Sequence, residues 1–385
     1  MNNFIYENHT KVYFGKDGVK EYLLSLVKNY GDTVMLAYGG GSVKKNGIYD
    51  EVTDILQKAG KTVIEFSGIM SNPTYAKVQE GAELARENHV DLILAVGGGS
   101  VIDCCKIVSA QAKLSEDIWK METVKKTYPS SFIPMGAIVT ASGTGAEMNA
   151  GAVITNEEKK IKCGLMGAQA EFVFLDPTYT MSVPFKQVIS GAFDTLSHAM
   201  ETYFGKPNDN NLSDDINEAV MRSIIRNIRI LLSDHENYDA RSELMWASSM
   251  AENGILKIGK ITDFQCHQIE HQLGAYTDCN HGQGLAVIHP VLYLHIYKDG
   301  AERFARFAKN VWGITDKGCD EKNALAGVEA LKNFIEEIGL PTNFTRMGIP
   351  EDTDFRAIAD STNLTAGCCK KLTHDEIYEI LKECI

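Results

Sequence analysis

The sequence lacks the features that would insert the chain in a membrane or mark it for an oxidising compartment. No segment reaches the run of about 18 apolar residues that suggests a transmembrane helix, and the N-terminus does not combine a basic start with an apolar run. The nine cysteines are an odd number and show neither C-x2-C zinc spacing nor a disulfide framework. We therefore expect a cytoplasmic protein with reduced thiols that is not inserted in a membrane.

Positive charge is also scarce. The 38 Lys and Arg residues are outnumbered by 51 Asp and Glu residues, which gives a formal net charge of −13. Nucleic acid and anionic membrane surfaces both require a basic face, so the charge argues against them as partners. The contents of 44% apolar and 23% charged residues are ordinary for a globular protein, and 385 residues suffice for two domains.

The first half of the chain alternates short apolar runs with helical patterns. Residues 33–38, 61–66 and 91–96 are predicted strands, and 45–60 and 74–88 are predicted helices. The run at 91–96 is apolar throughout, as is typical of a strand buried on both faces of a parallel sheet. The alternation predicts an α/β domain with a mostly parallel, Rossmann-like sheet.

The second half, from about Met181, consists of long helical patterns such as 211–234 and 323–339. It contains few strand signals, so we expect an all-α helical domain there. We place the dinucleotide-binding domain at residues 1–180 and the helical, metal-binding catalytic domain at residues 181–385.

A glycine run follows the buried strand at 91–96. It consists of Gly97, Gly98, Gly99 and Ser100, and a helical pattern comes directly after it. Glycines between a strand and a helix let the backbone approach a ligand and direct several N–H groups and the helix dipole at a phosphate. A glycine run alone is more often a tight turn, but this position favours a pyrophosphate-binding site.

A second glycine run, with Gly40, Gly41 and Ser42, follows the strand at 33–38. Sites that prefer NAD place an acidic side chain near this point, which binds the ribose and repels a 2′-phosphate. Here Lys44 and Lys45 follow the glycines instead, which favours NADP(H) over NAD(H). The alternative is that the lysines are solvated and that Ser42 only caps a helix.

A third candidate for cofactor binding lies in residues 140–154. Thr140, Ser142 and Thr144 could contact a phosphate or the nicotinamide, or they could make turn contacts and cap a helix. Lys160 lies in a polar stretch that resembles a hairpin and is a weaker candidate.

Histidines and one aspartate suggest a metal site in the second half. Asp194 and His198 are four residues apart in a helical pattern, so both side chains leave the same face. His267, His271 and His281 lie within one later stretch, and two of them could complete a site for zinc, iron, cobalt or nickel. A lone histidine is usually an ordinary packed or surface residue, and the spacing leaves open which of the three would be ligands.

Taken together, these segments resemble a known family over nearly the whole chain. The motifs are YGGGSVKKNG, GGGSVIDCCK, TGAE, FDTLSHAMETY, HQIEHQLGA and HGQGLAVIHP. They resemble the iron-dependent, group III alcohol dehydrogenases, and within them the branch of NADPH-dependent butanol dehydrogenases and broad-range aldehyde reductases. The resemblance implies an active site in the cleft between the two domains, and a homodimer.

The resemblance also implies roles for individual residues. The metal ligands are expected to be Asp194, His198, His267 and His281, with His271 beside the nicotinamide and substrate as a proton relay. Residues expected to contact the cofactor are Gly40, Gly41, Ser42, Gly97, Gly98, Gly99, Ser100, Asp103, Thr140, Ser142, Thr144 and Lys160. Gly40 stands where NAD-using relatives place an aspartate, which agrees with NADP(H). Ala146 departs from the serine that relatives often carry.

The expected reaction is hydride transfer between NADP(H) and a small to medium aliphatic alcohol or aldehyde, such as butanol or butyraldehyde. Fe²⁺ is the favoured metal, and Zn²⁺ also suits three imidazoles and one carboxylate. The alternatives are a diol oxidoreductase similar to glycerol dehydrogenase, a lyase similar to dehydroquinate synthase, and a protein that only binds metal or nucleotide. The lyase requires several basic residues around its substrate, and the stretch from His267 to His281 contains no arginine.

Overall fold

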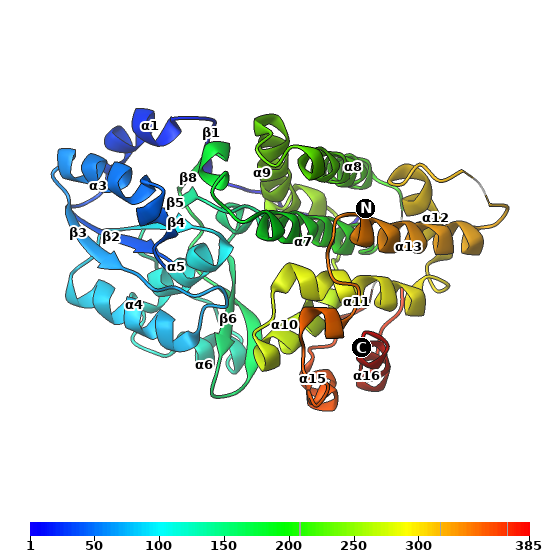
Figure 1. Ribbon diagram of the computed structural model, residues 1–385. Helices are drawn as coiled ribbons and strands as arrows, with labels where there is room; N and C mark the ends of the chain where they lie inside the picture. The colour runs from blue at the N-terminus through cyan, green and yellow to red at the C-terminus, as the bar shows by residue number, and fades with distance from the viewer. Residues whose placement is uncertain (208, 316, 368) are drawn as a thin grey trace. The chain divides into compact units, whose positions relative to one another are not determined.

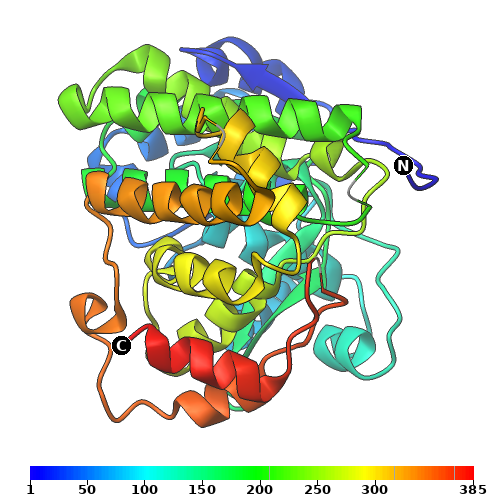
Figure 2. The ribbon, with the colours of Figure 1, turned by 90° about the vertical axis from the view of Figure 1, so that its right-hand side faces the viewer.

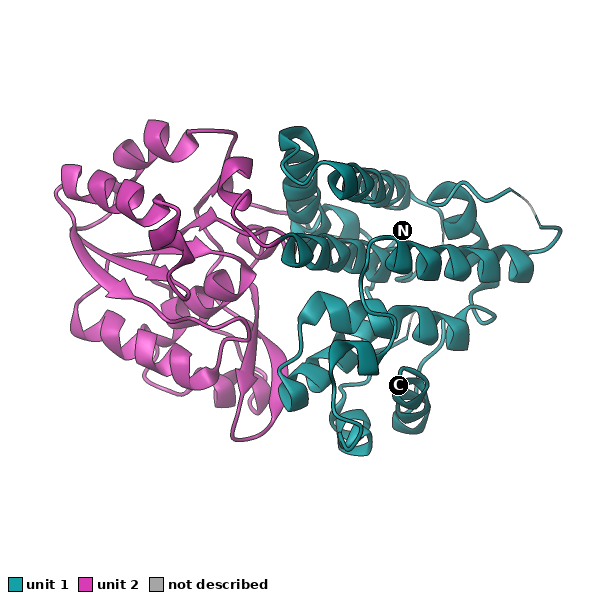
Figure 3. Cartoon of the chain, in the orientation of Figure 1, with its two compact units in different colours: residues 1–6, 185–385 teal, residues 7–184 magenta. Residues whose placement is uncertain are grey.

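The computed structural model describes residues 1–207, 209–315, 317–367 and 369–385. The chain divides into two compact units, coloured separately in Figure 3. Residues 7–184 form an α/β unit, and residues 1–6 together with 185–385 form a helical unit. The domain limits expected at 1–180 and 181–385, and an active site in a cleft between the domains, stay predictions.

The α/β unit is built on a six-stranded sheet in which every pair of neighbouring strands is parallel (Figure 1). The strand order is β1-β8-β5-β4-β2-β3. The bounds are β1 Lys11–Phe14, β2 Thr33–Tyr38, β3 Thr62–Phe66, β4 Leu92–Gly97, β5 Met135–Val139 and β8 Phe172–Leu175. A separate antiparallel hairpin consists of β6 Gly151–Asn156 and β7 Ile161–Met166. The predicted parallel sheet is confirmed.

Helices cover both faces of this sheet. Alternate strand residues such as Val34 and Leu36 pack with α1 and α3 in one core, while α4 and α5 pack against each other and α5 contacts β4 and β5. The helices of the unit are α1 Gly18–Val27, α2 Ser42–Lys45, α3 Ile48–Lys58, α4 Tyr75–Glu87, α5 Gly99–Gln111 and α6 Ile118–Thr123, with short 3-10 helices η1 Ala146–Met148 and η2 Pro177–Thr180. The prediction of one helix over 45–60 is wrong in one respect. The helix begins only at Ile48, because Gly47, at φ 80°, separates α2 from α3.

The strand order brings the two glycine runs together. β2 and β4 are neighbours, with Tyr38 paired to Val96, so the turns that follow them leave the same carboxyl edge of the sheet. The chain runs outward from β2 to β3 and then returns to β4, so the connections reverse direction at this point. Such a switch point is where open α/β sheets bind their ligands.

All named elements of the helical unit in the described residues are helices. Their bounds are α7 Phe185–Tyr203, α8 Leu212–Ser233, α9 Tyr238–Glu252, η3 Ile255–Lys257, α10 Gln265–Thr277, α11 His281–Ile296, α12 Ala301–Asn310, α13 Asp320–Glu337, α14 Phe344–Met347, α15 Phe355–Ser361 and α16 His374–Glu383. One apolar core joins most of them, and Figure 2 gives a second view of these helices, with α13 in orange and α16 in red. The predicted helical second half is confirmed.

A buried ion cluster fixes the end of α7 to α8 and α12. The carboxylate of Asp214 forms ion pairs with Lys260 and Arg303, and the side chains of Asp214 and Lys260 are 0% exposed. Both cations also donate to the carbonyl oxygen of Tyr203, the last residue of α7. Because the charges are paired and hydrogen-bonded, their burial is tolerated.

None of the helices in the part of the chain that the structure describes is both long and apolar enough to cross a membrane.

Candidate active site

Helix α7 places Asp194 and His198 one turn apart on a buried face. Asp194 is 3% exposed and His198 is 9% exposed. The Nε2 atom of His198 lies 3.7 Å from Oδ1 of Asp194. The spacing of four residues therefore brings both side chains to one point, as the sequence predicts.

Helices α10 and α11 bring two more histidines to the same carboxylate. Nε2 of His267, on α10, lies 3.4 Å from Oδ1 of Asp194, and Nε2 of His281, the first residue of α11, lies 3.5 Å from it. Gly282 lets α11 begin this close to α7, because a Cβ atom there would lie 2.2 Å from the carbonyl oxygen of Ser190.

The geometry of this cluster fits a divalent metal ion. Ligand atoms 2.0–2.2 Å from a tetrahedral ion are about 3.3–3.6 Å apart, close to the three distances from Asp194 Oδ1. The ligand atoms of Asp194, His267 and His281 all lie within 4.8 Å of one another, and His198 stacks on His267 with ring centroids 4.5 Å apart. Among the described residues, Asp194 Oδ1 and His267 Nε2 are buried without a hydrogen-bond partner. An ion at this point would satisfy both atoms.

Two buried glutamates that the sequence analysis missed hold the outer nitrogens of two histidines. Glu201, on α7, contacts Nδ1 of His267, and Glu270, on α10, contacts Nδ1 of His281. A carboxylate on Nδ1 leaves the lone pair of Nε2 free for a metal, which is the usual arrangement around metal-bound histidines. The only sequence signal was their position three residues after His198 and His267, which does not reveal burial.

The charges around the cluster suit a cation. Burial opposes ionisation of Asp194, but the positive charges that the rings of His198 and His281 carry when protonated outweigh it and hold the pKa of this carboxyl below its ordinary value. Burial lowers the pKa of His198 to about 4, so the ring is neutral at pH 7. For His267, burial is outweighed by the charge of Glu201, which raises the pKa to about 10; a metal ion must therefore displace a proton from this ring.

His271 lies beside this cluster. Its ring stacks on that of His281 with centroids 5.6 Å apart, and the centroid of the His267 ring is 6.1 Å away. It is 6% exposed. Its expected action as a proton relay stays a prediction.

In the α/β unit, the turn after β4 packs closely against the loop that follows β5. Gly98 precedes α5 without a side-chain cap, so the first N–H groups of a long helix point out of this turn. A Cβ atom on Gly99 would lie 2.3 Å from Oγ1 of Thr144. The N–H of Thr140 donates to the carbonyl oxygen of Gly97 over 3.0 Å. Two of the expected cofactor segments, the glycine turn at 97–100 and the segment at 140–144, are therefore brought together, and Ser142 lies between Thr140 and Thr144.

Three other expected cofactor residues, Asp103, Lys160 and Ser100, have different surroundings. Asp103 accepts from the N–H of Val153 over 2.9 Å and forms an ion pair over 3.4 Å with the buried Lys106. Lys160 lies exposed in the turn between β6 and β7 at φ 50°, while Lys162, two residues later, is 5% exposed. Ser100 donates to the carbonyl oxygen of Ser71. Their contacts with a cofactor stay predictions.

The turn after β2 is open, and one of its lysines is paired with an acid. Gly40 and Ser42 are exposed, and a Cβ atom on Gly40 or Gly41 would meet nothing within 4 Å. Lys44 forms an ion pair with Glu65, at the end of the neighbouring strand β3, over 3.2 Å. The same carboxylate accepts from the hydroxyls of Tyr38 and Tyr49. The sequence analysis missed this acid, which reduces the positive charge that Lys44 offers to a 2′-phosphate.

Comparison with known proteins agrees with the geometry. The family described as iron-containing alcohol dehydrogenase matches residues 9–177, and its C-terminal part, described as Fe-containing alcohol dehydrogenase family, C-terminal, matches residues 188–385. The chain belongs to the iron-containing alcohol dehydrogenase family. Membership in this family implies a nicotinamide cofactor and a divalent metal, and it makes the chain an oxidoreductase of the alcohol dehydrogenase class.

Relatives within the family are similar along the whole chain. NADH-dependent butanol dehydrogenase A of Clostridium acetobutylicum is 39% identical over 393 residues, covering 100% of both chains. The NADPH-dependent aldehyde reductase YqhD of Escherichia coli is 36% identical over 356 residues, covering 91% of this chain and 90% of the relative. The crystal structure of NADH-dependent butanol dehydrogenase A from Thermotoga maritima has a TM-score of 0.94 at 36% identity, over 100% of this chain and 99% of that one. The names of these relatives include both nicotinamide cofactors.

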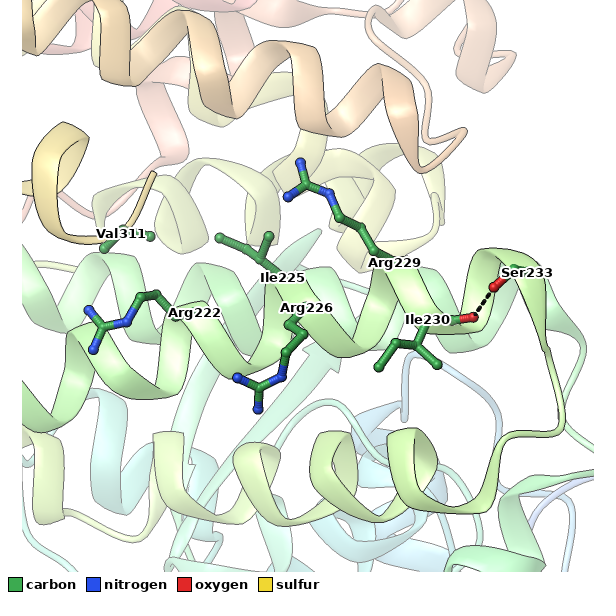
Figure 4. Close-up of a pocket in the computed structure, with 7 residues that line it drawn as sticks. All are labelled: Arg222, Ile225, Arg226, Arg229, Ile230, Ser233 and Val311. Atoms are coloured by element: carbon green, nitrogen blue, oxygen red, sulfur yellow. Dashed lines mark hydrogen bonds between the residues drawn. The ribbon is translucent and has the colours of Figure 1, made fainter. Parts of the chain in front are cut away.

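A separate hollow lies along α8 in the helical unit and contains none of the predicted site residues. Figure 4 shows the residues that line it, which are Arg222, Ile225, Arg226, Arg229, Ile230, Ser233 and Val311. Its arginines already have acceptors: Arg229 binds Glu337 through two contacts of 2.7 Å, and Arg222 donates to the carbonyl oxygen of Asn310 over 2.7 Å. We therefore do not assign a ligand to this hollow.

Proposed function

We propose that the chain is a metal-dependent alcohol dehydrogenase and aldehyde reductase that transfers hydride between NADP(H) and small to medium aliphatic substrates such as butanol and butyraldehyde. The observation that carries the proposal is the convergence of three imidazole Nε2 atoms on one carboxylate oxygen, at 3.4, 3.5 and 3.7 Å. We propose Asp194, His198, His267 and His281 as the metal ligands. Fe²⁺ is favoured by the family, and Zn²⁺ also suits this set of ligands.

The chemistry divides between the bound groups and the protein. A divalent ion supplies Lewis acidity to the substrate oxygen, and the nicotinamide supplies or accepts hydride. The four proposed ligands would hold the ion, and Glu201 and Glu270 contact the outer ring nitrogens of two of them. His271 is our candidate for moving a proton between the substrate oxygen and water, because an imidazole can both accept and release a proton near neutral pH.

The surroundings of the proposed ligands favour an apolar substrate. The ring of Phe264 lies 5.2 Å from that of His267 and 5.9 Å from that of His198, measured between centroids. An aliphatic aldehyde fits such surroundings better than a phosphorylated sugar. The butanol dehydrogenases and the aldehyde reductase among the relatives support this substrate class.

For the cofactor, we propose NADP(H) in preference to NAD(H). The turn after β2 carries Gly40, Gly41 and Ser42, leaves open space beside its glycines and has Lys45 exposed next to it. The pyrophosphate is proposed to lie on Gly97, Gly98, Gly99 and Ser100, at the start of α5. Asp103, Thr140, Ser142, Thr144 and Lys160 complete the proposed cofactor site. The NADPH-dependent aldehyde reductase among the relatives supports NADP(H). Other relatives are named for NADH, so the preference is tested by comparing the activities with NADPH and with NADH.

We also propose a homodimer. β1 lies at the edge of the sheet, and among the described strands it pairs only with β8. Phe14 at its end is 46% exposed. An open edge of this kind can pair with a strand of a second copy. The molar mass in solution, measured by light scattering, tests this part of the proposal.

The experiment that tests the proposed function is reconstitution. The protein, stripped of metal, is loaded anaerobically with Fe²⁺ or with Zn²⁺ and assayed with NADPH and NADH against a series of aliphatic aldehydes. We expect oxidation of NADPH with butyraldehyde only in the loaded protein. A preference for glycerol over butanol in the reverse direction would instead support a diol oxidoreductase.

A further inference from the structure

The histidine at the start of α11 is the least enclosed of the proposed metal ligands. The side chain of His281 is 25% exposed, against 11% for His198 and 5% for His267. As the first residue of its helix, it also has no preceding helical turn to restrict its ring. Some other contact must therefore fix the direction of its Nε2 atom.

That contact is the carboxylate of Glu270. Glu270 is 0% exposed, lies on α10 and approaches Nδ1 of His281 with Oε2. When Nδ1–H donates to this carboxylate, the ring is held in the tautomer that carries its lone pair on Nε2. Nε2 then faces Oδ1 of Asp194, 3.5 Å away.

The chain is also shaped to admit this glutamate. A Cβ atom on Gly284 would lie 2.9 Å from Cγ of Glu270 and 3.3 Å from its Oε1. The first of these distances is too short for two carbon atoms that are not bonded, so a side chain at 284 would push Glu270 away from His281. The second glycine of the HGQG segment therefore makes room for a carboxylate from α10.

We propose that Glu270 is a positioning residue for the metal, which fixes the tautomer and the ring of His281 and so raises the affinity of the site. This inference rests on the proposed ligand set. Glu201 acts in the same way on His267, but it also accepts from the backbone N–H groups of Cys266 and His267 at the start of α10, over 2.6 and 3.2 Å. Removing Glu201 would disturb the helix as well, so Glu270 gives the clearer test.

The test compares Glu270→Gln and Glu270→Leu with the wild-type chain. Glu270→Gln keeps the shape of the side chain without its charge, and Glu270→Leu removes the acceptor. The matched control is Glu218→Gln, because Glu218 is also buried in the helical unit, where it accepts from Tyr203 over 2.8 Å and from Arg306 over 2.6 Å. Zn²⁺ affinity is measured by competition with a chelator, the coordination geometry by the visible absorption of bound Co²⁺, and stability by the Tm of the metal-free protein.

We expect Glu270→Leu to bind Zn²⁺ about 10- to 100-fold more weakly, with Glu270→Gln between it and the wild type. The Co²⁺ spectrum should change in both variants and stay unchanged in Glu218→Gln. Wild-type affinity and an unchanged Co²⁺ spectrum in both Glu270 variants would overturn the inference and leave the proposed function intact. An equal loss of Zn²⁺ in Glu218→Gln would also overturn it, because the effect would then follow general loss of folding. If the wild-type chain itself binds neither Zn²⁺ nor Fe²⁺, the proposed function is refuted, and the inference about Glu270, which rests on it, is refuted with it.

Discussion

The buried carboxylate of Asp214 gives the sharpest prediction about stability. It faces Lys260 and Arg303, and the exposed fractions of the three side chains are 0%, 0% and 2%. Asp214→Asn keeps the shape of the side chain but removes the charge that balances two buried cations. The acceptors left for the two cations are then the carbonyl oxygen of Tyr203, the side chain of Asn210 and the single amide oxygen of the new asparagine.

The expected cost is large because neither cation can reach water. Breaking a buried ion pair by removing one partner costs about 3–5 kcal/mol. Asp214 also accepts from the N–H of Asn211 over 3.2 Å in the capping box of α8, and an amide can replace this contact only in part. We therefore expect Asp214→Asn to lower the free energy of unfolding of the helical unit by about 3–5 kcal/mol.

Urea unfolding followed by tryptophan fluorescence measures this loss, since two of the three tryptophans, Trp246 and Trp312, lie in the helical unit. The matched control is Asp360→Asn. Asp360 pairs with Arg356 at the surface, where the side chains are 51% and 45% exposed, and such solvated pairs contribute little to stability. A loss below about 1 kcal/mol for Asp214→Asn, or an equal loss for the control, would refute the reasoning.

Three further predictions concern the cofactor, pH and the proton relay. Glu65→Gln should raise the ratio of kcat/KM for NADPH over NADH about two- to fivefold, because it releases Lys44 from its ion pair and leaves its charge available to a 2′-phosphate. The control is Glu116→Gln, which removes the exposed pair with Lys125 in the same unit and should leave the ratio unchanged. Burial raises the pKa of Glu122 to about 7, above its unfolded value of about 4.3, so ionisation costs stability as the pH rises through this window. Glu122→Gln should therefore raise Tm at pH 8 and have little effect at pH 4, and a gain independent of pH would contradict this. His271→Ala should lower turnover while the bound metal is retained. Loss of the metal from this variant would show that His271 helps to hold the metal and that its assignment as a proton relay is wrong.

Local patterns were sufficient to predict much of the fold. The strand at 33–38 agrees with β2, and the helix predicted at 74–88 agrees with α4, which Thr74 caps through its side chain. These elements follow from the spacing of apolar residues and from capping, which depend on nearby residues alone. The spacing of Asp194 and His198 was informative for the same reason, since both lie on one helix.

Contacts between distant segments were beyond the reach of sequence patterns. Glu65 lies 21 residues from Lys44, and only the pairing of β2 with β3 brings the two together. Glu201 lies 66 residues from His267. A glutamate in a helical pattern is usually solvated, so its burial against a histidine becomes visible only when the helices pack. The break between α2 and α3 was missed because an isolated glycine is tolerated within a helical pattern.

The central claim is that a divalent ion held by Asp194, His198, His267 and His281 is required for hydride transfer. The most direct test measures the metal content and the oxidation of NADPH by butyraldehyde in the same samples of wild-type and Asp194→Asn protein. We predict that activity in the wild type rises in proportion to bound metal up to one ion per chain, and that Asp194→Asn neither retains the ion nor regains activity. Full activity in wild-type protein that contains no metal would contradict the claim.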